Sequence, residues 1–306
     1  MKNSEQQKTH KTVLLSETVD GLNLQKKNTA IDATVGVGGH AEKIANKIGR
    51  GGILLAIDAD ELSLALAKER LKDSDATIVF VQGNFRNISE LAKEAGVTKA
   101  HGVVFDLGWH AEQLTSGRGL SFKAEEPLLM TFSMTDYGIT AKDIIADWDE
   151  DEIAKIIREY GEERFSGRIA RVIVEERKRK PIETARELAD IIMSAVPAFY
   201  QRGKLHPATR TFQALRIAVN DELAALTDAL GQALELLTPG GRLAVISFHS
   251  LEDRIVKHAF REAEDHGVGI RITKKPIVPS LTERRENPRA RSAKLRIFQK
   301  HHEQKI

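Results

Sequence analysis

Residues 28–40 read NTAIDATVGVGGH. The first half of this stretch predicts a buried strand, the glycines predict a tight turn, and AEKIANKI at 41–48 predicts the helix that follows. Glycines in such a turn let the backbone approach a ligand, and the helix N-terminus offers N–H donors that have no partner within the helix. The turn is therefore a candidate ligand site, although a purely structural turn would have the same sequence.

The segments that follow repeat this alternation of strand and helix. Predicted strands at 51–60, 76–85 and 100–108 alternate with predicted helices at 61–71 and 88–96. This alternation predicts the parallel, doubly wound sheet of an α/β protein. From about 110 to 206 only helical segments are predicted, which indicates an inserted domain. The sheet is expected to resume with strands at 242–248, 269–276 and 293–300.

Acidic residues stand at the ends of two predicted strands. Asp58 ends the second strand, about twenty residues after the turn, where an acid can accept ribose hydroxyls. Asp106 ends the fourth strand, and Phe85, placed to line a pocket or to join the core, follows the third. The glycine spacing is G-x-G-G and not the G-x-G-x-x-G that holds a pyrophosphate. Of NAD and S-adenosylmethionine, the spacing favours the second, which has no phosphate.

Composition and charge exclude several classes of protein. The chain has 306 residues and no cysteine, which excludes disulfides, thiolate catalysis and cysteine-bound metal, and we assign no metal ligands. No membrane span or signal peptide is predicted, so we expect a cytoplasmic protein. The net charge is +2, but residues 271–300 hold ten Lys or Arg against two Glu. This basic segment predicts a polyanionic partner, or else an ordinary solvated surface.

Longer motifs form a more specific pattern, which spans roughly residues 10–300. They are HKTVLLSETVDGL (10–22), DATVGVGGH (32–40), AIDAD (56–60), DLG (106–108), RGLSF (118–122), EYGEERF (159–165), HPATRTFQALRIAVNDEL (206–223), PGGRLAVISFHSLEDRIVK (239–257) and NPRARSAKLR (287–296). With these motifs the chain resembles the bacterial 16S rRNA cytosine-N4 methyltransferases, S-adenosylmethionine enzymes that modify a decoding-site cytidine.

The resemblance implies a fold, a division into domains and a set of cofactor contacts. The fold would be that of a class I S-adenosylmethionine-dependent methyltransferase, a Rossmann-like doubly wound sheet with a helical insertion. Residues 10–109 and 207–306 would form the methyltransferase domain, and 110–206 a helical insertion domain for substrate recognition. The residues implied to contact S-adenosyl-L-methionine are Gly38, Gly39, His40, Asp58, Phe85, Asp106 and Gln113.

Two segments depart from the family pattern. The family reads DLGxSSxQLD after the fourth strand, where this chain reads DLGWHAEQLT at 106–115. The family then reads PLDMRMD, where this chain reads PLLMTFS at 127–133. Enzymes of this class place the acceptor base beside the segment after the fourth strand. The substitutions are therefore expected to lie on the substrate side of the site.

Methylation of a cytosine N4 amine needs a hydrogen-bond acceptor, because the lone pair of that amine is delocalised into the ring. An acceptor for the N4 hydrogens would localise the lone pair and later take a proton. Asp106 is the first candidate for this catalytic role and His110, which can accept at neutral pH, is the second. Trp109 is placed to stack on an unpaired or flipped cytidine, or to form a wall of the pocket.

Candidate contacts to RNA come from three parts of the chain. A helix predicted over 207–236 carries a polar stripe, Thr209, Gln213, Arg216 and Asn220, which would bind RNA or satisfy buried polar groups. Ser250 and Asp253 fit a helix-capping box, and His249 before them would face the substrate from the end of a strand. The full set of predicted substrate-binding residues is Trp109, Arg210, Gln213, Arg216, Asn220, His249, Arg289 and Arg291.

The predicted function is S-adenosylmethionine-dependent methylation of the N4 amine of a cytidine in 16S rRNA of the small ribosomal subunit. Two alternatives stay open: a paralogue without transferase activity that binds cofactor and rRNA as an assembly factor, or a methyltransferase for another RNA base. The segments at 109–115 and 127–133 favour the alternatives, whereas the glycine turn, Asp58, Asp106 and Gln113 favour an enzyme. No membrane partner is expected, and a homodimer is compatible with the sequence.

Overall fold

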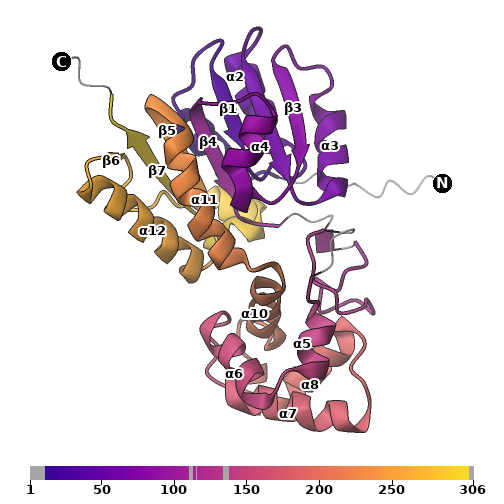
Figure 1. Cartoon of the computed structure of the whole chain (residues 1–306). Coiled ribbons are helices and arrows are strands. Elements are labelled where there is room, and N and C mark those ends of the chain that lie inside the picture. The colour runs from indigo at the N-terminus through magenta and orange to yellow at the C-terminus, as the bar shows by residue number, and fades with distance from the viewer. Residues whose placement is uncertain (1–10, 110–112, 115, 134–137, 303–306) are drawn as a thin grey trace. The chain divides into compact units, whose positions relative to one another are not determined.

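The computed structural model describes residues 11–109, 113–114, 116–133 and 138–302. The chain divides into two compact units, which are described separately (Figure 1). The sheet unit comprises residues 1–110 and 223–306, and the helical unit comprises residues 111–222. Within the described ranges, no helix is both long enough and apolar enough to cross a membrane.

The sheet unit is built on seven strands in the order β3-β2-β1-β4-β5-β7-β6. The first five are parallel, and β7 runs antiparallel to both of its neighbours. The direction of strand order reverses between β1 and β4, and sheets of this kind bind ligands at such a switch point. The strands are β1 (Thr29–Asp32), β2 (Ile53–Asp58), β3 (Thr77–Gln82), β4 (Ala100–Asp106), β5 (Leu237–Ser247), β6 (Gly269–Arg271) and β7 (Lys294–Lys300).

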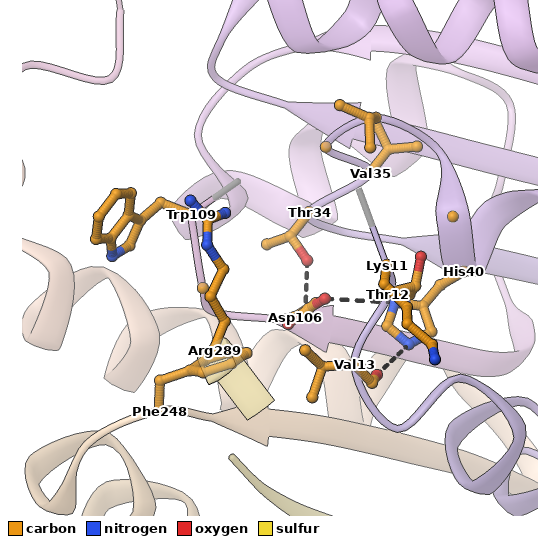
Figure 2. Close-up of a pocket in the computed structure, with 14 residues that line it drawn as sticks. Lys11, Thr12, Val13, Thr34, Val35, His40, Asp106, Trp109, Phe248 and Arg289 are labelled. Atoms are coloured by element: carbon orange, nitrogen blue, oxygen red, sulfur yellow. Dashed lines mark hydrogen bonds and ion pairs between the residues drawn. The ribbon is translucent and has the colours of Figure 1, made fainter. Parts of the chain in front are cut away.

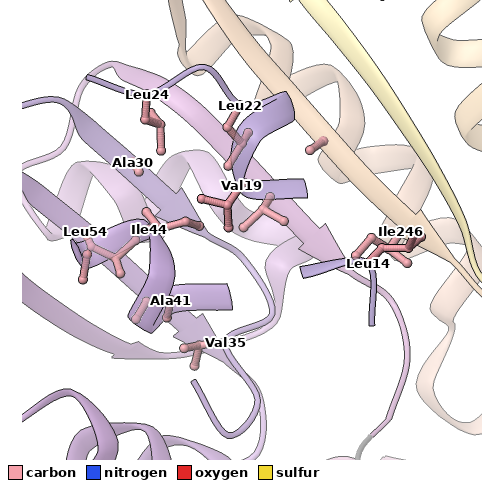
Figure 3. Close-up of a cluster of buried hydrophobic side chains, with 14 of the residues drawn as sticks. Leu14, Val19, Leu22, Leu24, Ala30, Val35, Ala41, Ile44, Leu54 and Ile246 are labelled. Atoms are coloured by element: carbon pink, nitrogen blue, oxygen red, sulfur yellow. The ribbon is translucent and has the colours of Figure 1, made fainter. Parts of the chain in front are cut away.

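Neighbouring residues of a strand point to opposite faces of the sheet, and both faces of these strands are apolar. Helices therefore cover both faces of this sheet. Leu54 and Val104 belong to one buried cluster and Leu55 and Val103 to the other. Figure 3 shows the first cluster, to which Ile44 also belongs. The helices are α1 (Leu15–Gly21), α2 (Gly39–Ile48), α3 (Glu61–Leu71), α4 (Ile88–Glu94), α11 (Glu222–Leu236), α12 (Ser250–Asp265) and α13 (Leu281–Glu286), with 3₁₀ turns η1 (Phe85–Asn87) and η3 (Pro288–Ser292).

The helical unit has its own buried core, which includes Ile153, Ile169, Leu188 and Phe212. Three of its helices begin with reciprocal capping boxes, in which the N-cap side chain and the side chain three residues later each accept the other's backbone N–H. Its described residues contain no strand, in agreement with the prediction. The helices are α5 (Ala141–Asp147), α6 (Glu150–Glu159), α7 (Ser166–Arg179), α8 (Ala185–Ala195), α9 (Ala198–Gln201) and α10 (Ala208–Asn220).

The prediction of one long helix over 207–236 is wrong. The apolar periodicity over 207–236 suggests a single helix, but α10 ends at Asn220 and α11 begins at Glu222. Between them Asp221 has φ = 47°, a left-handed conformation that ends a helix. The compact helical unit extends to residue 222, so its end differs from the boundary predicted at 206/207.

The start of α12 also differs from the prediction. The N-cap is His249 and its capping-box partner is Glu252, one position earlier than the predicted Ser250 and Asp253. Asp253 instead accepts hydrogen bonds from Lys294 Nζ (3.1 Å) and Arg296 Nε (2.7 Å). Partial burial raises the pKa of Asp253, but these two cations outweigh burial and hold the pKa below its ordinary value. These two contacts tie α12 to β7, and they pair two cations of the basic segment within the protein.

Candidate active site

A pocket lies at the carboxyl ends of β1 and β4, where the strand order reverses (Figure 2). It encloses about 550 Å³, a volume that includes its open mouth. Its lining comes from the N-terminal segment, the glycine turn, the end of β4, β5 and η3. The lining residues are Lys11, Thr12, Val13, Thr34, Val35, Gly36, Val37, Gly39, His40, Asp106, Gly108, Trp109, Phe248 and Arg289.

The glycine turn needs its glycines for two different reasons. Gly36 and Gly38 have positive φ angles of 51° and 84°, which most other residues rarely adopt. At Gly39 the reason is space, since a Cβ atom there would lie 1.9 Å from Thr12 Oγ1. Asp58 holds the turn from β2: its Oδ2 accepts the Gly36 N–H at 2.8 Å and its Oδ1 accepts the Asp60 N–H at 2.9 Å.

His40 and Asp106 form a pair at the base of the pocket. His40 is buried, with Nε2 3.2 Å from the Val13 carbonyl and Nδ1 3.4 Å from Asp106 Oδ2. Burial lowers the pKa of His40, but the Asp106 carboxylate more than compensates, so the net pKa is raised. With acceptors at both nitrogens, the ring is best satisfied as an imidazolium that donates twice.

Asp106 itself presents one side-chain oxygen that has no hydrogen-bond partner in the described part of the chain. Its backbone N–H donates to Thr34 Oγ1 at 2.6 Å, which fixes the residue at the end of β4. Its Oδ1 atom is buried and has no hydrogen-bond partner among the described residues. A buried acceptor without a partner is costly unless a ligand satisfies it. The atom therefore marks where a donor group of a ligand would bind.

Asp32 is a second buried carboxyl group at this point. Burial raises its pKa to about 7, against the lowering effects of His40 and the Thr34 N–H; nearby Asp106 and Asp58 raise it further. Thr34 N donates to Asp32 Oδ1 at 3.2 Å. Asp32, His40 and Asp106 thus share one buried region, in which a positive ring lies near two acids.

This arrangement predicts a pH dependence of stability. The pKa of Asp32 is about 7 in the folded chain against an ordinary 3.8, so folding takes up a proton between these values and the stability falls as the pH rises through them. The raised pKa of His40 acts in the same direction, because its contribution is present below 6.5 and is lost above its folded pKa. We expect Asp32→Asn to be more stable than the parent chain at pH 8, by roughly 2–4 kcal/mol.

Thermal unfolding from pH 5 to pH 8 measures this effect. The variant keeps the Oδ1 acceptor for Thr34 but cannot ionise, so its melting temperature should vary less with pH. Asp73→Asn, at an exposed position after α3, is the control and should parallel the parent chain. Parallel curves for Asp32→Asn and the parent would contradict the assignment.

The mouth of the pocket carries an aromatic ring and a cation. The guanidinium carbon of Arg289, on η3, lies 5.6 Å from the centre of the Trp109 ring, within cation–π range. Asn287 Nδ2, just before η3, donates to the Lys11 carbonyl at 2.8 Å. Leu14 N donates to Glu283 Oε1 at 2.8 Å, and Lys11 forms an ion pair with Glu286. Residues 11–14 therefore lie between the glycine turn and the basic C-terminal segment.

The pocket contains several of the residues predicted from the sequence. Gly39, His40, Asp106, Trp109 and Arg289 line it. Gly38 is the N-cap of α2, and Asp58 holds the turn through its hydrogen bond with the Gly36 N–H. The Phe85 ring packs edge-on against Phe105, with ring centres 5.6 Å apart.

The other predicted residues lie elsewhere. His249 caps α12, and its Nε2 is 3.1 Å from Glu252 Oε1. Arg291 is exposed on η3. His110 lies outside the described residues. Gln113 is a buried residue of the helical unit.

The polar stripe of α10 makes contacts within the helical unit. Gln213 Nε2 donates to the Tyr160 carbonyl at 2.9 Å, and Arg216 forms a two-pronged ion pair with Glu222. Asn220 donates to the Met130 carbonyl and accepts from Phe132 N. Arg210 Nη1 donates to the Glu162 carbonyl at 3.2 Å. These contacts favour the structural interpretation of the stripe for Gln213, Arg216 and Asn220.

Sequence reasoning missed nine lining residues of the pocket: Lys11, Thr12, Val13, Thr34, Val35, Gly36, Val37, Gly108 and Phe248. Lys11, Thr12 and Val13 belong to the motif at 10–22, and only the length of that motif indicated that these residues matter. Thr34 lies inside the glycine turn. Its hydroxyl can accept the Asp106 N–H only because β1 and β4 are neighbours in the sheet.

The sheet order, the glycine turn after β1 and the acids after β2 and β4 define a class I S-adenosylmethionine-dependent methyltransferase, as the sequence predicted. The pocket fits such a cofactor, since it offers backbone without side chains at Gly36 and Gly39 and, at Asp106, an acceptor that no described residue satisfies. A family model described as the MraW methylase family matches residues 7–301. The chain belongs to the MraW methylase family.

Known relatives and solved structures resemble the chain over nearly its whole length. Ribosomal RNA small subunit methyltransferase H of Brevibacillus brevis (strain 47 / JCM 6285 / NBRC 100599) is 46% identical, covering 95% of this chain and 98% of the relative. An rRNA methylase from Streptococcus thermophilus is 13% identical with a TM-score of 0.44, covering 94% and 95%. A SAM-dependent O-methyltransferase from Thermotoga maritima is 10% identical with a TM-score of 0.43, covering 95% and 66%.

Proposed function

We propose that this chain transfers a methyl group from S-adenosylmethionine to the N4 amine of a cytidine in 16S rRNA of the small ribosomal subunit, in the cytoplasm. The observation that carries the proposal is Asp106 Oδ1, a buried acceptor without a partner among the described residues of a pocket in an MraW-family chain. The name of the Brevibacillus relative supports small-subunit rRNA as the substrate.

The cofactor would be held by the glycine turn and the acids around it. Gly38, Gly39 and His40 form the start of α2, and the Asp58 carboxylate keeps lone pairs beyond the two N–H groups that it binds. Phe85, Asp106 and Gln113 complete the proposed set. S-adenosylmethionine supplies an electrophilic methyl group on a sulfonium, and Asp106 is proposed to take part both in binding it and in the reaction.

The chemical role proposed for Asp106 follows from Oδ1, the oxygen to which no described residue donates a hydrogen bond. An N4 amine hydrogen-bonded to Oδ1 would have its lone pair localised on nitrogen, and the carboxylate would receive a proton from it. His40 holds the other oxygen and the Val13 carbonyl, so it fixes the orientation of the carboxylate. Thr34 fixes the backbone of the same residue. We propose Asp106 as the catalytic acceptor and His40 as a positioning residue.

The substrate is proposed to reach this oxygen through the mouth of the pocket. Trp109 offers a ring on which an unpaired or flipped cytidine can stack, and Arg289 beside it carries a charge for phosphate. Arg291 on the same turn is exposed and would add a second phosphate contact. In the helical unit Arg210 is the member of the predicted set whose side chain is partly exposed and only weakly paired.

The first test is methyl transfer from labelled S-adenosylmethionine to unmethylated small subunits and to free 16S rRNA, followed by nucleoside analysis. We expect label on cytidine N4. Label on another nucleoside would contradict the proposed acceptor, and absence of label would contradict the transfer activity and favour an assembly factor.

A separate measurement tests the cofactor site. S-adenosylmethionine should raise the melting temperature of the parent chain, because it binds the folded state. We expect Asp58→Ala to abolish this rise. Asp58→Asn keeps an oxygen for the Gly36 N–H and separates loss of binding from loss of the turn. A rise of equal size in both variants and in the parent would place the cofactor elsewhere.

A further inference from the structure

An arginine surrounded by aromatic rings lies on the helical unit, between α6 and α7 and beside α9. The guanidinium carbon of Arg164 is 4.8 Å from the ring centre of Phe165, 5.7 Å from that of Phe199 and 5.0 Å from that of Tyr200. Phe199 is 66% exposed, which is unusual for a phenylalanine. Among the described residues, no ion pair joins Arg164 to a carboxylate.

A buried carboxylate holds this cluster in place. The Glu163 side chain is fully buried; its Oε2 accepts the Tyr200 hydroxyl at 2.5 Å and its Oε1 accepts the Phe165 N–H at 2.8 Å. Arg210 Nη1 lies 3.9 Å from the same Oε2. The loop after α6 is thus tied to α9 and α10, so the exposed ring of Phe199 projects from an ordered base.

The stretch of sequence that carries this ring has charged side chains of one sign. Residues 191–220 contain no Asp or Glu, and they include Arg202, Lys204 and Arg210. Arg202 and Lys204 follow α9 directly and are exposed. An exposed ring with cations on adjacent residues has the chemistry of a single-stranded nucleic acid site, because every base has a face that stacks and every nucleotide has a phosphate.

We propose that an unpaired base of the substrate RNA stacks on Phe199, beside the Arg164 guanidinium, while Arg202 and Lys204 contact its neighbouring phosphates. This inference rests on the proposed rRNA substrate. A protein partner fits less well, since the exposed large apolar side chains in the described part of this unit are only Ile139, Phe199 and Leu205. Protein interfaces of ordinary size need a broader apolar centre.

Binding of a labelled single-stranded RNA of about twelve nucleotides tests the proposal directly. We expect Phe199→Ala to weaken binding about tenfold, without change in the dependence of affinity on salt. The double variant Arg202→Ala with Lys204→Ala should lower the slope of log affinity against log salt by about 1.4, since each phosphate contact on a single strand contributes about 0.7. Phe199→Trp should restore affinity.

Controls separate this site from general effects. Leu62→Ala removes an apolar side chain that is 51% exposed on α3 of the sheet unit, and its RNA affinity should equal that of the parent chain. Thermal unfolding verifies that Phe199→Ala is folded. Unchanged RNA affinity in Phe199→Ala would overturn the inference. The inference would also be wrong if Phe199→Ala bound RNA normally but lost self-association or binding to another protein.

The outcome can be distinguished from failure of the proposed function. If the parent chain methylates cytidine N4 but Phe199→Ala binds RNA as the parent does, the stacking site is wrong and the function stands. If the parent transfers no methyl group to small-subunit rRNA, the proposed function fails, and the affinity measurements still decide whether Phe199 binds RNA.

Discussion

Asp106→Asn is expected to reduce the rate of methyl transfer by about 10³-fold, the usual size of a general acid–base contribution. The amide nearly preserves the shape of the carboxyl group but cannot take a proton from an amine. It also removes the negative charge that faces His40 Nδ1 at 3.4 Å, so the pKa of His40 should fall. The lost proton acceptor and the lost charge both come from the Asp106 carboxylate, and the lost proton acceptor affects the reaction itself.

Single-turnover measurements with saturating cofactor separate chemistry from binding. We expect the dissociation constant for S-adenosylmethionine to change far less than the rate, because Gly38, Gly39 and Asp58 are untouched. Asp73→Asn, at an exposed position, is the matched control and should transfer at the parent rate. A rate for Asp106→Asn within about threefold of the parent, against the 10²-fold minimum for a general base, would exclude the catalytic role.

Gly39→Ala is expected to have the second large effect, on both folding and cofactor binding. The new Cβ would lie 1.9 Å from Thr12 Oγ1 and 3.0 Å from Thr12 Cβ, so the N-terminal segment must move. Overpacking of this kind costs about 1–3 kcal/mol. Movement of residues 11–13 also withdraws the Val13 carbonyl from His40, and three lining residues leave the pocket.

A double-mutant cycle tests this contact specifically. Thr12→Ala removes the Oγ1 and Cγ2 atoms, so the pair Gly39→Ala with Thr12→Ala should recover part of the melting temperature and of the cofactor affinity that Gly39→Ala loses. Gly231→Ala, in α11, is the matched control because a Cβ there meets nothing within 4 Å. Additive losses in the double variant would show that Thr12 is not the obstacle.

These two predictions concern the His40–Asp106 pair and the N-terminal segment, residues 11–14, that packs against it. Val13 binds His40, and the residues around it bind α13 and the residue before η3 through Glu283 and Asn287. The N-terminal segment therefore joins the cofactor turn to the basic segment that carries Arg289. A substitution at Asn287 would act on the pocket through Lys11 without contacting a ligand.

Local patterns determined most of the fold from the sequence alone. The alternation of apolar strands with helices, the glycine turn and the acids at strand ends need only a few neighbouring residues to be recognised, and the sheet and its pocket followed from them. The MraW-family motifs were readable for the same reason: each is a continuous stretch such as 32–40 or 206–223.

Only the tertiary structure decided which distant residues meet. Thr12 against Gly39, Val13 and Asp106 on either side of His40, and Asp253 between Lys294 and Arg296 join positions far apart in the chain. Periodicity also failed at Asp221, because one residue with positive φ ends a helix without interrupting the apolar pattern. The sequence determines where local hydrogen bonds and apolar faces form, whereas the pairing of buried charges depends on packing, which no single stretch contains.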